Sequence, residues 1–126
     1  MSISADVVAV VDDDVYALGG LGRVLSSYGY RVYMFTSAER YLDTADASKA
    51  SCVVIDIDLR SEMSGLDLGR AISSSGNAIP IIFMTGSADP AIRKQALDMG
   101  CVAFLEKPFP SELLITAILK SSAPGS

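Results

Sequence analysis

The sequence predicts an α/β domain: a doubly wound, five-stranded parallel sheet in the order 2-1-3-4-5, with five helices. Two observations indicate this fold. Short apolar segments alternate with helical patterns along all 126 residues, a length typical of one domain. Three of these segments, VVAVV, CVVI and IIFM, are apolar at consecutive positions, as expected for strands that helices cover on both faces.

The strands are predicted where apolar and β-branched residues concentrate between turn-forming residues. Their predicted spans are Asp6–Val11, Arg31–Phe35, Ser51–Asp56, Pro80–Met84 and Val102–Glu106. The second of these, RVYMF, mixes polar and apolar residues. We therefore expect this strand to lie near an edge of the sheet.

The first two helices follow the first two strands. Apolar residues recur every three or four positions from Val15 to Tyr28, which predicts an amphipathic helix. Asp14 precedes this stripe and is interpreted as its N-cap. Thr36 and Glu39 have the spacing of a capping box, which predicts that the second helix begins there.

The remaining three helices are marked mainly by their boundaries. A third helix is expected over about Leu66–Ser74. Asp89, followed by proline, is a predicted N-cap for the fourth helix, and Gly100 would end it. Pro110 suits the first turn of a last helix that runs to Lys120.

The composition predicts one soluble domain over residues 1–126, with a disordered tail over 121–126. The net charge is −5 and histidine is absent, which excludes histidine catalysis and disfavours nucleic-acid binding by this chain. The chain shows neither a secretory signal nor an apolar run long enough to span a membrane, so a cytoplasmic location is expected. Cys52 and Cys101 lie in apolar contexts and are expected to be reduced.

Polar residues stand at the predicted carboxyl ends of four strands. Asp12 and Asp13 follow the first strand, Asp56 ends the third, Thr85 follows the fourth and Lys107 follows the fifth. In a doubly wound sheet these ends converge on one crevice. Carboxylates from neighbouring strands suit Mg²⁺, and a carboxylate can act as the nucleophile toward a phosphoryl group. Asp12, Asp13, Thr85 and Lys107 are each ordinary in a turn, whereas Asp56, directly after CVVI, would be costly unless it is paired. The ordered set predicts a site.

Four segments, VAVVDDD, VVIDIDL with MSGLDL, IIFMTG and FLEKPF, resemble in order and spacing the receiver domain of two-component response regulators. The resemblance covers about Asp6 to Lys120. It implies a flavodoxin-like fold and an aspartate phosphorylated by a histidine kinase or a histidine phosphotransfer protein. It also implies a requirement for Mg²⁺, with Mn²⁺ as a substitute.

The resemblance assigns a role to each matching residue. Asp13 would hold the metal directly and Asp12 mostly through water, while the backbone carbonyl of Asp58 would add a further ligand. Thr85 would be the switch hydroxyl. The other matches are Asp56 as phosphoacceptor, Lys107 as the lysine that contacts the phosphoryl group and precedes a cis proline, and Phe104 as the aromatic switch.

Asp56 and Asp58 are both candidates for the phosphoacceptor, because the loop before Gly65 differs in length from the family pattern. If Asp58 were the acceptor, Asp56 would be an unpaired carboxylate inside a buried strand, which is costly. With Asp56 as acceptor, the extra residue falls in a loop, where an insertion costs little. Asp56 is therefore predicted. The loop has Arg60 where the family commonly has proline, and the Asp58 charge is expected to alter phosphoryl lifetime or metal dependence.

Two alternatives remain open. The sequence DID mimics the DxD motif of haloacid dehalogenase-like phosphatases, and a pseudo-receiver would be an interaction module without phosphorylation. As a receiver, the chain is expected to turn over no small-molecule substrate. It would present a surface formed by the fourth helix, fifth strand and fifth helix for partner binding or dimerisation. The output partner or domain is not indicated by the sequence.

Overall fold

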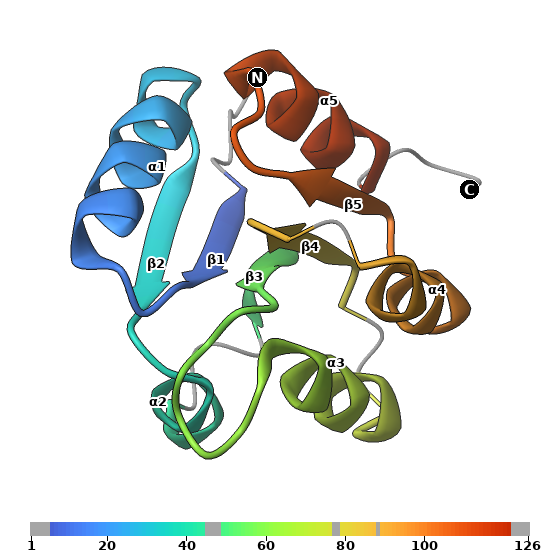
Figure 1. Cartoon of the computed structure of the whole chain (residues 1–126). Coiled ribbons are helices and arrows are strands. Elements are labelled where there is room, and N and C mark those ends of the chain that lie inside the picture. The colour runs from blue at the N-terminus through green and yellow to red at the C-terminus, as the bar shows by residue number, and fades with distance from the viewer. Residues whose placement is uncertain (1–5, 45–48, 77–78, 88, 122–126) are drawn as a thin grey trace.

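The computed structural model describes residues 6–44, 49–76, 79–87 and 89–121, and its strands form one parallel sheet in the order β2-β1-β3-β4-β5 (Figure 1). The predicted fold class and strand order are confirmed. The strands are β1 (Val7–Val11), β2 (Arg31–Phe35), β3 (Cys52–Asp56), β4 (Ile81–Thr85) and β5 (Ala103–Glu106). Each predicted strand lies within one residue of its observed bounds.

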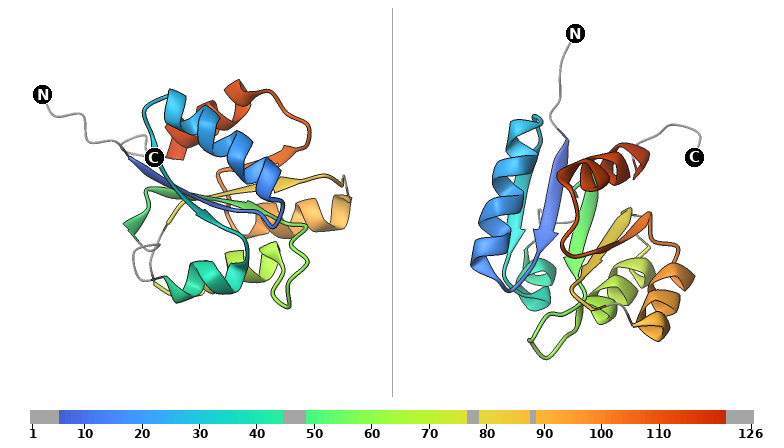
Figure 2. Two further views of the ribbon diagram at one scale, coloured as in Figure 1. Left: turned by 90° about the vertical axis from the view of Figure 1, so that its left-hand side faces the viewer. Right: turned by 45° about the horizontal axis from the view of Figure 1, so that its top comes forward.

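In the part of the chain that the structure describes, five helices cover the sheet. They are α1 (Val15–Ser27), α2 (Ala38–Asp43), α3 (Gly65–Ser74), α4 (Pro90–Asp98) and α5 (Ser111–Ser121). Helices α1 and α5 lie on one face, and α2, α3 and α4 lie on the other (Figures 1 and 2). Among the described residues, no helix is both long and apolar enough to cross a membrane.

The two faces explain why the central strands are apolar at consecutive positions. Successive side chains of a strand point to opposite faces. Val8 and Val10 of β1 join the core layer under α1 and α5, whereas Ala9 and Val11 join the layer under α2, α3 and α4. All four are fully buried. Both faces of the central strands therefore need apolar residues.

Strand β2 lies at an edge of the sheet, as its mixed sequence predicts. It pairs with β1 alone, and Arg31 and Met34 are exposed. The Met34 sulfur also explains one of the glycines in α1. A Cβ placed on Gly22 would lie 3.0 Å from that sulfur, so glycine lets the helix pack closely on the edge strand.

Several predicted helix boundaries are confirmed. The Asp14 carboxylate accepts hydrogen bonds from the backbone N–H groups of Tyr16 and Ala17 and caps α1. Asp89 caps α4 with proline at the first helical position. Gly100, just past that helix, has a φ of 78°, a left-handed conformation that favours glycine.

Two other boundary predictions are wrong. Helix α2 is capped by Ser37, whose hydroxyl accepts from the Arg40 N–H, and not by a Thr36–Glu39 capping box. Helix α5 begins at Ser111, so Pro110 precedes its first residue. The sequence predicts a disordered tail over residues 121–126, but Ser121 is the last residue of α5. Residues 122–126 lie outside the described residues.

Both cysteines are free thiols, as expected from their sequence contexts. Cys52 is fully buried and Cys101 is half-buried. Burial raises the pKa of the Cys52 thiol to about 11, which keeps it protonated and unreactive at neutral pH.

Candidate functional site

Four strands deliver polar residues to one end of the sheet. Asp12 follows β1, Asp56 is the last residue of β3, Thr85 is the last residue of β4, and Lys107 follows β5. Since β1, β3, β4 and β5 are adjacent and parallel, their carboxyl ends meet at one edge. The predicted convergence of these side chains is thus confirmed, and it follows from strand order alone.

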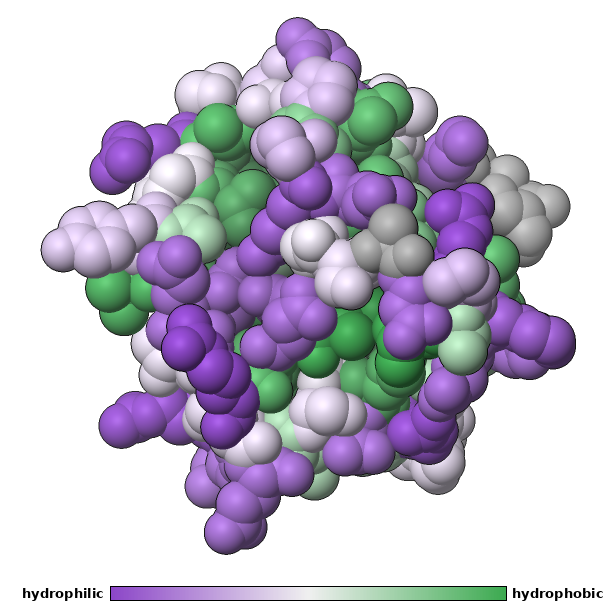
Figure 3. Space-filling view, viewed as in Figure 1, coloured by the Kyte–Doolittle hydropathy of each residue, from purple (hydrophilic) through white to green (hydrophobic). Residues whose placement is uncertain are grey.

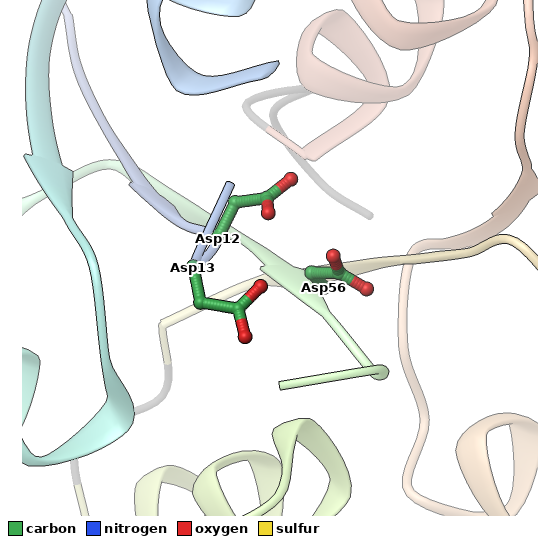
Figure 4. A group of neighbouring side chains, drawn as sticks. All are labelled: Asp12, Asp13 and Asp56. Carbon is green, nitrogen blue, oxygen red and sulfur yellow. The ribbon is translucent and has the colours of Figure 1, made fainter. Parts of the chain in front are cut away.

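Three carboxylates form the acidic part of this crevice. One oxygen from each of Asp12, Asp13 and Asp56 lies within 4.8 Å of the others. Figure 4 shows the three side chains projecting into the same space from the ends of β1 and β3. Seen from the same side as Figure 1, hydrophilic residues gather across the middle of this face (Figure 3). Such an oxygen-only group has the donor chemistry that hard divalent cations prefer.

Lys107 joins the two most buried of these acids. Its Nζ lies 3.2 Å from Asp12 Oδ2 and 3.0 Å from Asp56 Oδ2. The side chain of Asp12 is fully buried and that of Asp56 is 6% exposed, so the lysine compensates two carboxylates removed from water. The peptide bond between Lys107 and Pro108 is cis, as the resemblance implies.

The electrostatics of the crevice show a surplus of negative charge. Burial raises the pKa of Asp12, a backbone hydrogen bond from Asp14 lowers it, and the nearby Asp56 charge raises it further. Burial alone would lower the pKa of Lys107. Hydrogen bonds and charge attraction from Asp56 and Asp12 outweigh that effect and raise it. A second cation at this point would relieve the remaining repulsion.

The Asp56 carboxylate is held by two donors of different kinds. Its Oδ1 accepts a hydrogen bond of 2.8 Å from the backbone N–H of Asp58, and its Oδ2 accepts one from the Lys107 ammonium. Strand β3 ends at Asp56 with every residue buried up to that point. The strand therefore ends at Asp56, as predicted, while the buried apolar side chains of Ile57 and Leu59 follow it.

Asp58 points to a different part of the crevice. Its Oδ2 accepts a hydrogen bond of 3.0 Å from the Thr85 hydroxyl and one of 2.8 Å from the Gly86 N–H. The side chain is exposed, and it is not part of the group of three acids. The sequence indicates a negative charge near Asp56, but it gives no sign that this charge is bonded to the predicted switch hydroxyl.

The loop after β3 is tied to the rest of the fold at two points. The Arg60 N–H donates to Asp13 Oδ2 at 3.0 Å, and the Met63 N–H donates to Glu39 Oε2 of α2 at 3.1 Å. Leu59 is buried in the core. Figure 1 shows this loop passing beside α2 before it enters α3. These two hydrogen bonds and the buried Leu59 side chain hold the loop against the end of β1 and against α2.

Gly65 closes this loop and is required for steric reasons. A Cβ at this position would overlap the carbonyl oxygen of Asp56 and lie 2.6 Å from the Cα of Ile57. The backbone that carries the predicted phosphoacceptor therefore packs directly on the start of α3. In the sequence, Gly65 stands out only by its spacing from Asp56, and the MSG sequence gives no sign of this contact.

Phe104 lies on β5. Its half-buried ring packs against the core layer beneath α2, α3 and α4. The Arg93 guanidinium carbon from α4 is 5.6 Å from the ring centroid, within the range of a cation–π contact. The predicted aromatic switch thus contacts a helix of the surface that the resemblance assigns to partner binding.

Fold and crevice together define a parallel α/β domain that gathers acids, a lysine and a buried hydroxyl at the ends of its strands. The family model described as the response regulator receiver domain matches residues 8–119. The chain therefore belongs to the receiver domain family of two-component response regulators.

Several curated proteins are similar to this chain in sequence. The response regulator protein TodT of Pseudomonas putida is 38% identical over 94% of this chain and 52% of its own length. The transcriptional regulatory protein FixJ of Bradyrhizobium diazoefficiens is 34% identical over 90% of this chain and 54% of its own. The chain thus spans about half the length of these curated relatives.

Two solved structures of relatives superpose on this chain. The crystal structure titled FixJ-N superposes with a TM-score of 0.83 at 33% identity and covers 95% of both chains. The response regulator StyR superposes with a TM-score of 0.84 at 32% identity, covering 94% of this chain and 59% of that one.

Proposed function

We propose that this domain accepts a phosphoryl group on Asp56 from a histidine kinase or a histidine phosphotransfer protein. The observation that supports this most directly is the setting of Asp56. It is a buried carboxylate at the end of a central strand, beside two further acids and in contact with Lys107 at 3.0 Å. A buried acid of this kind is a candidate for chemistry because its ionisation must be compensated.

The residues present fit a divalent cation. Asp12, Asp13 and Asp56 would contribute carboxylate oxygens, Asp12 mostly through water, and the backbone carbonyl of Asp58 would complete the protein ligands of Mg²⁺ or Mn²⁺. Burial raises the pKa of Asp12, and a cation beside this carboxylate would favour its ionised form. When bound, the cation would neutralise charge on the transferred phosphoryl oxygens.

The proposed transfer step uses Asp56, Lys107 and Thr85. A carboxylate oxygen of Asp56 would attack phosphorus, forming a P–O bond as the P–N bond of the donor phosphohistidine breaks. The electron pair of that bond leaves with the imidazole, which can take up a proton from water. The Lys107 ammonium would stabilise charge on the phosphoryl oxygens, and the Thr85 hydroxyl would donate a hydrogen bond to one of them.

Phosphorylation would change the surface of the domain. Movement of Thr85 toward the phosphoryl group would free space into which Phe104 swings, altering the face formed by α4, β5 and α5. That face would then bind a downstream partner, an output domain or a second copy. The domain would act in the cytoplasm as a signalling module, without turnover of a small-molecule substrate and without binding nucleic acid itself.

A phosphatase of the haloacid dehalogenase kind is not favoured. Its DxD motif normally follows the first strand, whereas Asp56 and Asp58 follow β3 here. The intact set of Asp13, Asp56, Thr85 and Lys107 likewise does not favour a pseudo-receiver. Sustained hydrolysis of a phosphate ester by the purified domain would reinstate the phosphatase.

Intact-mass spectrometry tests the proposal. Three chains are each incubated with Mg²⁺ and acetyl phosphate: the parent domain, the Asp56→Asn variant and the Asp58→Asn variant. We expect one phosphoryl adduct on the parent chain and on Asp58→Asn, none on Asp56→Asn, and loss of the adduct in hydroxylamine, which cleaves acyl phosphates. Absence of an adduct on the parent with several donors would overturn the proposal, and labelling of Asp56→Asn would move the acceptor to another residue.

A further inference from the structure

The contact between Asp58 and the end of β4 has no part in the phosphoryl transfer described above. Asp58 Oδ2 receives the Thr85 hydroxyl at 3.0 Å and the Gly86 N–H at 2.8 Å. Thr85 is buried, with 1% exposure, while Asp58 is exposed. A solvent-accessible carboxylate is therefore bonded to a hydroxyl that solvent cannot reach.

Asp58 also touches the phosphoacceptor. Its backbone N–H donates to Asp56 Oδ1 at 2.8 Å, while its side chain receives the two donors from β4. One residue thus connects the group that would be modified with the hydroxyl that would respond. The pairing of β3 with β4, which sets Asp56 opposite Met84, brings these two ends together.

The donors at the end of β4 are limited in number. A threonine hydroxyl carries one proton and the Gly86 amide carries one. Both lie within hydrogen-bonding distance of a single carboxylate oxygen, so this pair of donors can hold an anion, and Asp58 is the anion there. The Thr85 hydroxyl can also donate to the Ser87 carbonyl oxygen, which at 3.2 Å is the longer of its two contacts, and it accepts from the Ser87 N–H at 3.1 Å. Its proton therefore cannot serve Asp58 and a phosphoryl oxygen at once.

The geometry points to Asp58 as a positioning residue that competes with the phosphoryl group for Thr85 and Gly86. In the unmodified domain its carboxylate stands in for the phosphoryl oxygens and holds Thr85 in the resting position. Phosphorylation has to displace it, so Asp58 sets how strongly the modified state is favoured. This inference rests on the proposed function, because it requires a phosphoryl group on Asp56.

Replacing Asp58 with asparagine should weaken this competition. The amide oxygen keeps the shape of the acceptor but loses the charge, and hydrogen bonds to charged acceptors are the stronger kind. Two such bonds are involved. We expect the Asp58→Asn variant to bind a phosphoryl analogue at Asp56 about tenfold more tightly than the parent chain.

Beryllofluoride, a tetrahedral phosphoryl analogue, is the probe. Its affinity in the presence of Mg²⁺ is measured by fluorine NMR for the parent, Asp58→Asn and Glu62→Gln. Glu62 is exposed in the same loop, so Glu62→Gln removes an equal charge as a matched control. The Gly86 amide resonance is followed in the parent chain, where we expect it to shift as the analogue displaces Asp58.

A simple charge effect would also favour an anion once Asp58 is neutralised. The variant Thr85→Val separates the two causes, because it removes the hydroxyl and leaves the Asp58 charge. If Asp58 acts through Thr85, the gain from Asp58→Asn should shrink to less than half in the Thr85→Val background. A gain of the same size in both backgrounds would mean that only charge matters, and would overturn the inference.

The outcomes distinguish the inference from the proposed function. If beryllofluoride binds the parent chain and Asp58→Asn with equal affinity, or if the Gly86 amide resonance does not shift, the inference alone is overturned. Binding that survives Asp56→Asn, or no binding by any chain, overturns the proposed function and this inference with it. Tighter binding by Asp58→Asn, unchanged binding by Glu62→Gln and loss of the gain with Thr85→Val support it.

Discussion

Asp56 and Asp58 lie two residues apart, yet the two sides of the crevice that they occupy are built differently. On the β1 and β5 side, Asp56 and Asp12 are buried and share the Lys107 ammonium. On the β4 side, Asp58 is exposed and takes only neutral donors, a hydroxyl and an amide. The first side resembles a site for a cation, and the second a site for an anion that the chain itself fills.

This difference teaches that the neighbouring strand, and not the residue type, determines what each aspartate does. A buried carboxylate needs a compensating charge, so its removal or that of its partner is expensive. An exposed carboxylate with neutral donors can exchange them for water or another anion at little cost. Three substitutions should test this contrast between the Asp56 side and the Asp58 side of the crevice. The first acts on both sides at once.

The largest effect is expected from Gly65→Ala, because the new Cβ would overlap the Asp56 carbonyl oxygen. The backbone of Asp56 and Ile57, which carries both carboxylates of the crevice, would have to move. We therefore expect a loss of about 3 kcal/mol in the free energy of unfolding. Urea unfolding measures this. Gly20→Ala is the control: nothing lies within 4 Å of its added Cβ, so that change should stabilise α1 by about 0.5–1 kcal/mol. Equal effects at the two glycines would contradict the close packing at Gly65.

An intermediate effect is expected from Lys107→Met, which leaves Asp12 and Asp56 without their shared cation. We expect a loss of about 2 kcal/mol in the free energy of unfolding without divalent ions, much of it restored by Mg²⁺. Asp58→Asn should cost less than about 1 kcal/mol, because the exposed Asp58 side chain leaves no buried charge unpaired. Similar losses for both variants would show that the two sides do not differ as described.

The smallest effect is expected from Glu39→Gln, which weakens the hydrogen bond that ties the Met63 N–H to α2. We expect a loss of about 1 kcal/mol, faster hydrogen exchange at the Met63 amide, and a Mg²⁺ affinity within about twofold of the parent. Glu62→Gln in the same loop should change none of these. A large change in Mg²⁺ affinity for Glu39→Gln would mean that the loop also supports the cation side.

Much of the fold could be predicted because it depends on patterns that are local in sequence. Consecutive apolar residues mark the central strands, and Asp14 and Asp89 mark helix starts that the structure confirms. The predicted Thr36–Glu39 capping box is wrong because two neighbouring residues could each cap α2. Thr36 and Ser37 both offer a hydroxyl, and the choice depends on how the chain leaves β2, which the pattern does not record. Glu39, released from that role, contacts a residue 24 positions away.

The sequence by itself determined the order of strands and helices, the convergence of Asp12, Asp13, Asp56, Thr85 and Lys107, and the end of the buried strand at Asp56. These follow from periodicity and from the rule that parallel strands share one carboxyl edge. Only the tertiary structure decided where the Asp58 and Glu39 side chains point. Their partners lie 27 and 24 residues away, so strand register and loop path select them. Asp58, the second carboxylate of the DID sequence, thereby becomes the candidate competitor for the switch hydroxyl.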